Sequence, residues 1–190
     1  STCSYAAMPD KREQIENAAT DAIKKSGVRN VSFRTLAETV GVKSASVHYH
    51  FPTKSDLAVS VVDKYTLGFS EALDAIDRKH KSVSSRLMAF ARIFEDTLAN
   101  GELCLCGMMA SEVDELDQQT KASLQRFFRE AERWLVKTLE SQPDEVVSPL
   151  PPNELAKILM SGLEGAILID RAADGRARIK ALKSFIRSLF

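Results

Sequence analysis

Apolar residues recur through most of the chain at the three- and four-residue spacing of an α-helix. The first such segment is predicted over residues 10–26, and Gly27 is suited to end it because glycine tolerates a left-handed backbone. Its apolar face is formed by Ile15, Ala18, Ala19, Ala22 and Ile23. We find no segment in which apolar and polar residues alternate as in a half-buried strand. The pattern therefore predicts an all-α protein.

Two short helices are predicted next along the chain. Ser32 can cap the first, and Gly41 ends it. Ser44 can cap the second, which runs to about His50 and is closed by Pro52. The two helices are therefore separated by a turn of about three residues.

Longer helices are predicted from Thr53 onward, because Thr53 can cap a helix and the apolar spacing then continues. Four prolines between residues 142 and 152 require a loop there. With the three earlier segments, about nine helices are expected. The six later ones are predicted over residues 54–80, 82–99, 103–115, 118–141, 153–173 and 176–190.

Composition places the chain among ordinary globular proteins. Its 190 residues are 44% hydrophobic and 27% charged, and 26 basic residues balance 26 acidic ones. Nowhere do about 18 uncharged apolar residues follow one another, so we expect no membrane-spanning helix and no membrane partner. The first residues lack the basic and apolar regions of a secretory signal.

The cysteines and histidines indicate neither a disulfide framework nor a metal site. Cys3, Cys104 and Cys106 are odd in number, and two of them are one residue apart. No histidines and cysteines have the spacing of a zinc site. We therefore expect a reducing, cytoplasmic setting, no bound metal and no cofactor.

Residues 29–54 form a locally basic segment in an otherwise neutral chain. The segment contains four basic residues, Arg29, Arg34, Lys43 and Lys54, and one acidic residue, Glu38. The turn at residues 41–43 has the length and the glycine of a helix-turn-helix. The second helix begins with small residues, which allow a helix end to approach base edges closely. Donors at Tyr49, His50 and Lys54 suit phosphate oxygens.

The run from Gly41 to Leu57 resembles the helix-turn-helix signature of TetR/AcrR-family transcription regulators, and the resemblance extends over about residues 10–65. One departure is His48, which stands where the family usually has tyrosine. Val47 and Phe51 are expected to be core. The resemblance implies contacts to bases or the adjacent sugar-phosphate from Ser44, Ala45, Ser46 and His48. It implies phosphate contacts from Arg34, Thr35, Tyr49, His50 and Lys54. Lys11 and Arg12 are candidates for the flanking minor groove.

The same resemblance implies a division of labour along the chain. Residues 1–55 would form a helix-turn-helix DNA-binding domain, and residues 56–190 a helical domain for ligand binding and dimerisation. The implied function is that of a ligand-responsive transcriptional regulator. The expected form is a homodimeric repressor, released from a palindromic double-stranded operator by a small-molecule effector of unknown identity.

Small residues at Gly162, Gly165 and Ala166, followed by a second amphipathic helix, resemble the four-helix dimer interface of the family. An ordinary intramolecular core is the alternative interpretation. The predicted interface residues are Leu159, Gly162, Leu163, Ala166, Ile167, Leu182 and Phe185.

An effector pocket needs apolar walls and a few polar anchors. Arg92 and Glu164 interrupt the apolar pattern and are candidate anchors. Aromatic and methionine residues at helical spacing are also what a plain core contains, so both interpretations stay open. The predicted ligand-binding residues are Phe90, Phe94, Cys104, Met108, Met109, Phe127, Phe128, Trp134 and Met160.

Residues 103–112 carry the two neighbouring cysteines, Cys104 and Cys106. The stretch resembles a motif of a TetR subgroup that includes a regulator responding to acrylate or its thioester. Two thiols can sense electrophiles or oxidants, which gives a sensing regulator of the same fold as an alternative. Free cysteine is also a common small buried residue.

Enzyme motifs are missing from the sequence. It has no Gly-rich phosphate loop, no G-x-S-x-G and no H-E-x-x-H, so no catalytic residue is predicted. The acid pairs Glu112/Glu115 and Asp114/Asp117 are expected on a solvated helix face. A helical protein-interaction scaffold without DNA binding is the main rival. Duplex binding that weakens steeply with salt would distinguish the regulator from the scaffold.

Overall fold

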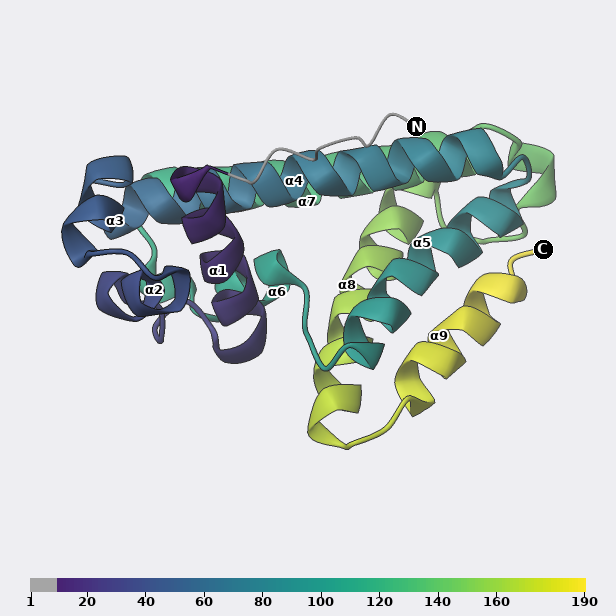
Figure 1. The fold of residues 1–190 in the computed structure, drawn as a ribbon. Helices are drawn as coiled ribbons and strands as arrows, with labels where there is room; N and C mark the ends of the chain where they lie inside the picture. Colours follow the sequence, from purple (N-terminus) through teal and green to yellow (C-terminus); the bar gives the residue numbers. More distant parts are fainter. Residues whose placement is uncertain (1–9) are drawn as a thin grey trace, which may run out of the picture.

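A computed structural model describes residues 10–190, so Cys3 and the first nine positions of the expected N-terminal domain lie outside the described residues. Over the described range the chain forms nine α-helices, two short 3₁₀ helices and no strand, and the all-α prediction is confirmed (Figure 1). The elements are α1 Lys11–Ser26, α2 Phe33–Val40, α3 Ser44–His50, α4 Lys54–Lys79, α5 Val83–Ala99, α6 Leu105–Ser111, η1 Val113–Glu115, α7 Gln118–Glu140, η2 Pro143–Glu145, α8 Pro152–Ala172 and α9 Ala177–Arg187.

Polar side chains cap most of the helices where the sequence predicts it. The Ser32 hydroxyl accepts a hydrogen bond from the Thr35 N–H at 3.1 Å. Thr53 and Asp56 form a reciprocal capping box at the start of α4. The prediction for α3 is wrong in one respect. Ser44 is its first helical residue, and Lys43 occupies the cap position without a side-chain hydrogen bond.

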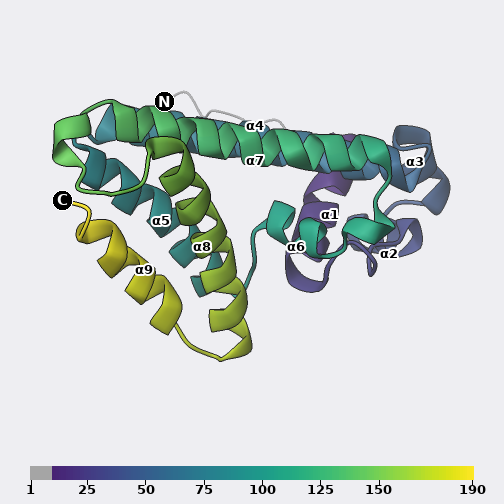
Figure 2. The same ribbon diagram turned by 180° about the vertical axis from the view of Figure 1, so that it is seen from behind.

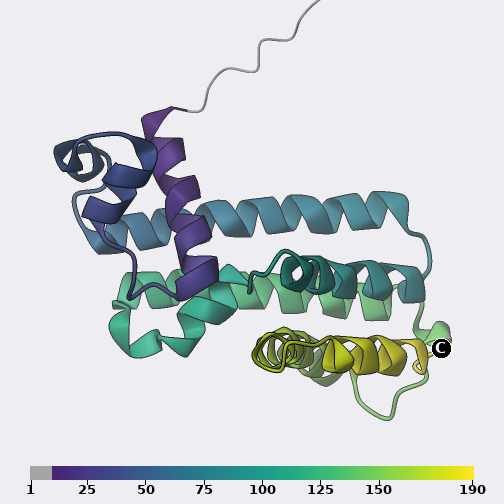
Figure 3. The same cartoon turned by 60° about the horizontal axis from the view of Figure 1, so that its bottom comes forward.

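Two long helices form the spine of the molecule. α4 and α7 run side by side along its length, as Figures 1 and 2 show from opposite sides. α1–α3 lie at one end of this spine, whereas α5, α8 and α9 lie against the other end. α6 lies between the two groups of helices. Figure 3 shows α8 and α9 next to each other at one edge of the molecule.

Three boundaries predicted from the sequence differ in detail from the structure. The apolar segment predicted over 103–115 is divided into α6 and η1, with Glu112 between them. The proline-rich segment contains η2, and α8 starts one residue earlier than predicted, at Pro152. Proline suits a first helical position because its missing N–H has no intrahelical partner there. The boundary expected after residue 55 falls inside α4, which continues through it without a break.

Aromatic side chains fill the core between α4, α5 and α7. Phe90 stacks on Trp134 with ring centroids 5.4 Å apart, and Phe127 lies 5.0 Å from Phe69. The Trp134 indole N–H donates to Asp77 at 3.2 Å, so its polar group is satisfied. This packing holds the spine and the second helical group together.

A buried carboxylate binds the first turn of α9. Asp170, at the end of α8, accepts hydrogen bonds from the backbone N–H groups of Arg178 and Ile179 and pairs with the Arg178 guanidinium at 3.2 Å. Burial alone would raise the pKa of Asp170, but these donors lower it below its ordinary value. Asp170 therefore fixes the α8–α9 corner as an ionised group.

Within residues 10–190, none of the helices combines the length and the apolar character that crossing a membrane requires.

Candidate nucleic-acid interface and effector cavity

α3 is anchored by two inward side chains and leaves its other faces open. Val47 and Phe51 are fully buried, as expected from the sequence. The predicted base-contacting residues Ser44, Ala45 and His48 are exposed, and Ser46 is half-buried. α3 thus presents a short surface of small and polar side chains to solvent.

The turn before α3 depends on Gly41. Its backbone is left-handed, at φ 72° and ψ 40°, and its N–H closes the end of α2 by donating to the carbonyl groups of Ala37 and Glu38. A side chain would be strained in this conformation. Gly41 therefore sets the angle between α2 and α3.

Two aromatic contacts fix side chains around α3. His48 meets Phe33 of α2 edge to face, with ring centroids 4.7 Å apart. Tyr49 is 83% exposed and touches the half-buried His50. A tyrosine this exposed contributes little to the core, so its hydroxyl remains available to an external partner.

Arg12 makes internal contacts that the sequence did not predict. Its guanidinium donates to the His50 carbonyl at 3.3 Å and to the Ser60 hydroxyl at 3.1 Å, and it lies 4.5 Å from the centre of the Phe51 ring. It also pairs with Glu16 at 3.3 Å. Because these contacts tie α1 to the end of α3 and to α4, Arg12 contributes to the internal structure of this unit. Lys11, the other minor-groove candidate, donates to Gln14 at 3.1 Å.

The predicted phosphate-contacting residues are on the surface beside α3. Arg34 forms a solvent-exposed pair with Glu38 at 3.1 Å, and such pairs contribute little enough to be exchanged for a phosphate. The Thr35 hydroxyl is 2.6 Å from that of Ser32. Within residues 10–190, neither Lys43 nor Lys54 has a carboxylate partner. These lysines contribute unneutralised positive charge next to α3.

A set of polar contacts that the sequence did not reveal ties the α1–α2 loop to the rest of the protein. Glu112, between α6 and η1, accepts hydrogen bonds from the backbone N–H groups of Val28 and Arg29 at 2.6 and 3.2 Å. Its carboxylate occupies the space where a Cβ at Gly27 would stand. Arg29 also pairs with Glu115 at 2.9 Å. We call these contacts, with those of Arg171 below, the α1 tether.

Arg171 completes the α1 tether from α8. Its guanidinium donates to the carbonyl groups of Lys24 and Lys25, at 3.3 and 3.1 Å, in the last turn of α1, where carbonyl groups have no intrahelical partner. The Leu103 N–H also donates to the Lys24 carbonyl at 3.3 Å. Glu112 is therefore half-buried and not on a solvated face as predicted, whereas Glu115 is exposed and pairs with Arg29.

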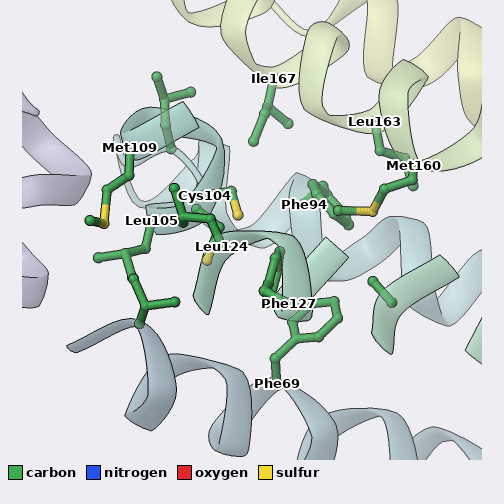
Figure 4. Close-up of a cluster of buried hydrophobic side chains, with 14 of the residues drawn as sticks. Phe69, Phe94, Cys104, Leu105, Met109, Leu124, Phe127, Met160, Leu163 and Ile167 are labelled. Atoms are coloured by element: carbon green, nitrogen blue, oxygen red, sulfur yellow. The ribbon is translucent and has the colours of Figure 1, made fainter. Parts of the chain in front are cut away.

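Most of the predicted ligand-binding residues are packed against one another as core. Phe90, Phe94, Met109, Phe127 and Met160 are almost completely buried. Figure 4 shows Phe127 against Phe69 in this cluster. Phe128 contacts Phe127, and Trp134 stacks on Phe90.

Two of the predicted ligand-binding residues, Cys104 and Met108, line a cavity between α6 and α8. It has a volume of about 110 Å³. Glu164, one of the two candidate anchors, is in its wall, whereas Arg92 is exposed on α5 and is not. The cavity lining comprises Leu103, Cys104, Gly107, Met108, Glu164, Gly165, Ile167 and Leu168.

Glu164 is the main electrostatic feature of the cavity. Its Oε1 atom is buried and has no hydrogen-bond partner among the described residues. Burial raises the pKa of Glu164 to about 7, and a hydrogen bond from Cys104 opposes this rise only in part. The other carboxylate oxygen lies where a Cβ at Gly107 would be, so the glycine makes room for the acid.

Cys104 and Cys106 are free, buried thiols. Burial and the nearby Glu164 raise the pKa of Cys104, and burial and Cys104 raise that of Cys106. Tyr65 donates to the Cys104 sulfur at 3.6 Å, and burial followed by the two cysteines raises the pKa of this tyrosine. Since the thiolate is the reactive form, this environment favours packing over electrophile or redox sensing.

The predicted dimer residues fall into two groups. Leu159, Leu163 and Ile167 are buried within the chain. That part of the prediction describes intramolecular core, because these side chains face α8's own neighbours. Gly162, Ala166, Leu182 and Phe185 line an open groove between α8 and α9 that also includes Gly165 and Ile169. Ile158, Leu168 and Ile169 extend the exposed apolar surface of α8.

Comparison with known proteins shows which proteins this sequence and fold resemble. Residues 15–61 match the family model of bacterial regulatory proteins of the tetR family, and this match contains α2, the turn and α3. A TetR transcriptional regulator from Legionella pneumophila is 27% identical. The match covers 96% of this chain and 98% of that one, with a TM-score of 0.89. Residues 15–61 form a domain of the TetR family, and the whole chain has the fold of TetR transcriptional regulators. Its helix-turn-helix is accordingly that of a DNA-binding transcriptional regulator.

A second TetR-family regulator, from Agrobacterium tumefaciens, is 25% identical to this one. The match covers 94% of this chain and 96% of that one, with a TM-score of 0.89. A regulatory protein TetR from Rhodobacter sphaeroides, 21% identical, shares the fold over 92% of this chain and 95% of its own, with a TM-score of 0.84. No match is found among curated protein sequences.

Proposed function

We propose that this TetR-family regulator is a non-enzymatic, homodimeric repressor that releases a palindromic operator when a small molecule binds. The observation that carries the proposal is the arrangement of α3. Val47 and Phe51 fix the helix from within while its small and polar residues face solvent. A helix held in this way can enter a major groove with its first residues against base edges.

The fold supports a division of labour within the chain. α1–α3 and the first turns of α4 would form the DNA-binding unit, in which Leu57 and Val61 of α4 are buried. The remaining helices would form the effector-binding and dimerisation unit. The expected boundary near residue 55 then lies in a continuous helix, which allows α4 to transmit movement between the two units.

Dimerisation would use the exposed apolar surface of α8 and α9. Ile169 is 49% exposed and Phe185 is 40% exposed. A Cβ at Gly165 would meet no atom of residues 10–190 within 4 Å, so a partner helix has room to approach there. A twofold axis through this surface would present two α3 helices to successive major-groove turns, about 34–36 Å apart.

The α1 tether supplies a route from effector to DNA. The cavity walls belong to α6 and α8, and residues next to these walls hold the end of α1 and the loop after it. A ligand that separates α6 from α8 would therefore move the DNA-binding unit. The ligand must bind the two arrangements with different affinity, and a coupling of about 1–3 kcal/mol is typical.

Selection of bound sequences from a random duplex library tests the DNA-binding part of the proposal. The full chain should enrich a palindrome, and His48→Ala should change the preference at one symmetric pair of positions. Val113→Ala, an exposed substitution on η1, should leave the selected sequence unchanged. Failure to enrich any duplex would instead favour the helical protein-interaction scaffold.

Analytical ultracentrifugation tests the dimer. Ile169→Glu should give monomers and weaken operator binding, because it places two carboxylates in the apolar interface. Val147→Glu, also a change from an exposed apolar residue to an acid, lies in the loop before α8 and should leave the dimer intact. A dimer that persists in Ile169→Glu would move the interface away from α8 and α9.

A further inference from the structure

We infer that the cavity between α6 and α8 binds a small organic cation, with an ammonium or amidinium N–H group donating to Glu164 and a short hydrocarbon part against the apolar walls. Binding of the cation does not depend on the proposed function. Only the expectation that a bound cation releases DNA rests on it.

The first observation is the unpaired oxygen in the cavity wall. Oε1 of Glu164 is buried and lacks a hydrogen-bond partner among the described residues. Buried polar atoms nearly always have a partner, and leaving one without a partner costs free energy. A carboxylate oxygen accepts hydrogen bonds, so the group that would satisfy it is an N–H or O–H donor.

The second observation is that, among residues 10–190, no positively charged group pairs with Glu164. The titratable groups that face it are the thiol of Cys104, with Cys106 behind it, and the hydroxyl of Tyr65 from α4. All three are neutral near pH 7, because their ordinary pKa values lie above 7 and burial raises them further. A bound cation would supply the missing charge, and hydrogen bonds between charged partners are the stronger class.

The third observation is the size and character of the space. Apart from Glu164, the walls are formed mainly by Leu103, Met108, Ile167, Leu168 and the edge of Gly107. Pockets for drug-sized ligands have volumes of about 300–1,000 Å³, whereas this cavity has about 110 Å³. The ligand is therefore small, with one polar end and a few carbon atoms.

Gly107 provides the space that the Glu164 carboxylate occupies. A Cβ at this position would collide with the Glu164 carboxylate. The glycine thus lets α6 pass close to the acid while the acid stays directed into the cavity wall. Gly107→Ala should displace the carboxylate and weaken cation binding without changing any charge.

Calorimetric titration with n-butylammonium, n-butanol and butyrate tests this inference, since the three probes have similar hydrocarbon parts and different head groups. The expected result is binding of n-butylammonium to the natural chain and to Glu154→Gln, an exposed acid on the same helix. Glu164→Gln should weaken this binding by about tenfold or more, because a neutral amide replaces the charged partner.

Proton release provides a readout that a merely structural effect would not produce. A cation stabilises the ionised form of Glu164, so binding at pH 6.5 should release protons, measured by titration in two buffers of different ionisation enthalpy. Tighter binding of butyrate with proton uptake would overturn the inference. It would instead favour an anionic effector, as the resemblance of residues 103–112 implies. Equal n-butylammonium binding by Glu164→Gln, or no binding by the natural chain, would also overturn it.

Duplex binding measured in the same samples separates this inference from the proposed function. If the chain binds its selected duplex but not n-butylammonium, the cation site is refuted and the regulator stands. If it binds n-butylammonium at Glu164 but no duplex, the site stands and the proposed function is refuted.

Discussion

Replacing Glu164 by glutamine keeps the shape of the side chain and removes its ionisable group. In the folded protein burial raises the pKa of Glu164 to about 7, from an ordinary value of 4.5. The folded state therefore holds this proton more tightly than the unfolded state does. It follows that the stability associated with the neutral acid is fully present below pH 4.5 and is lost as the pH rises to about 7.

The size of this effect follows from the difference between the two pKa values. At 1.36 kcal/mol per unit, it amounts to about 3 kcal/mol of unfolding free energy lost between pH 4.5 and 7, with little further change above. Glu164→Gln has no such titration. We therefore expect it to match the natural chain near pH 4.5 and to be more stable than it at pH 8.

Urea denaturation at four pH values between 4.5 and 8, at constant ionic strength, measures this difference. Glu154→Gln serves as the control and should follow the natural chain, because Glu154 is exposed. The other shifted acids, Glu95, Asp117 and Asp170, have lowered pKa values and titrate below this window. A Glu164→Gln variant that loses stability with pH as steeply as the natural chain would refute the reasoning.

Three further substitutions test the internal contacts. Asp170→Asn should lower the unfolding free energy at pH 7 by about 3 kcal/mol, because the ionised acid accepts two backbone hydrogen bonds and pairs with Arg178. The lowered pKa means that this difference should shrink as the pH falls below about 4. Urea denaturation at pH 7 and below about pH 4 checks this, and a difference that stays constant between them would contradict it. Phe90→Ala should cost about 3–5 kcal/mol in the same assay, whereas the exposed Tyr49→Ala should cost less than about 0.5. Equal costs would mean that Phe90 is not core. Glu112→Gln should accelerate amide hydrogen exchange at Val28 and Arg29 by about tenfold, since it weakens two charge-assisted hydrogen bonds. Unchanged exchange would remove Glu112 from the α1 tether.

Local signals in the sequence predicted the helices well. Gly41, Ser32 and Thr53 act where their chemistry suggested, because caps and turns depend on a few neighbouring residues. Ser44 is the exception, since any of several residues before a helix can occupy its cap position. Val47 and Phe51 were identified as core because the spacing of a short helix leaves them on one face.

Contacts between distant segments could not be predicted from spacing. Glu112 and Glu115 have the same local pattern as an exposed acid pair, and their partners lie more than 80 residues earlier in the chain. Arg12 likewise has a role that depends on where α3 and α4 pack.

The predicted ligand and dimer residues show a related limit. Helical periodicity identifies an apolar face without indicating what covers it. Leu159, Leu163 and Ile167 are therefore indistinguishable in sequence from interface residues, although they lie in the core. Glu164 could be singled out because a charge within an apolar pattern is unusual. Its position in a cavity wall required the fold.

The salt dependence of duplex binding tests the central claim most directly. Contacts between basic side chains and DNA phosphates release counterions, so they make the affinity depend on the salt concentration. The affinity of the full chain for its selected duplex should fall steeply and linearly on logarithmic axes. Lys54→Ala should reduce this slope by about one unit, or by about two for a dimer with both copies bound. Lys137→Ala, an exposed lysine near the far end of α7, should leave the slope unchanged. A slope that Lys54→Ala does not alter, or an affinity that salt does not affect, would contradict a DNA-binding surface around α3.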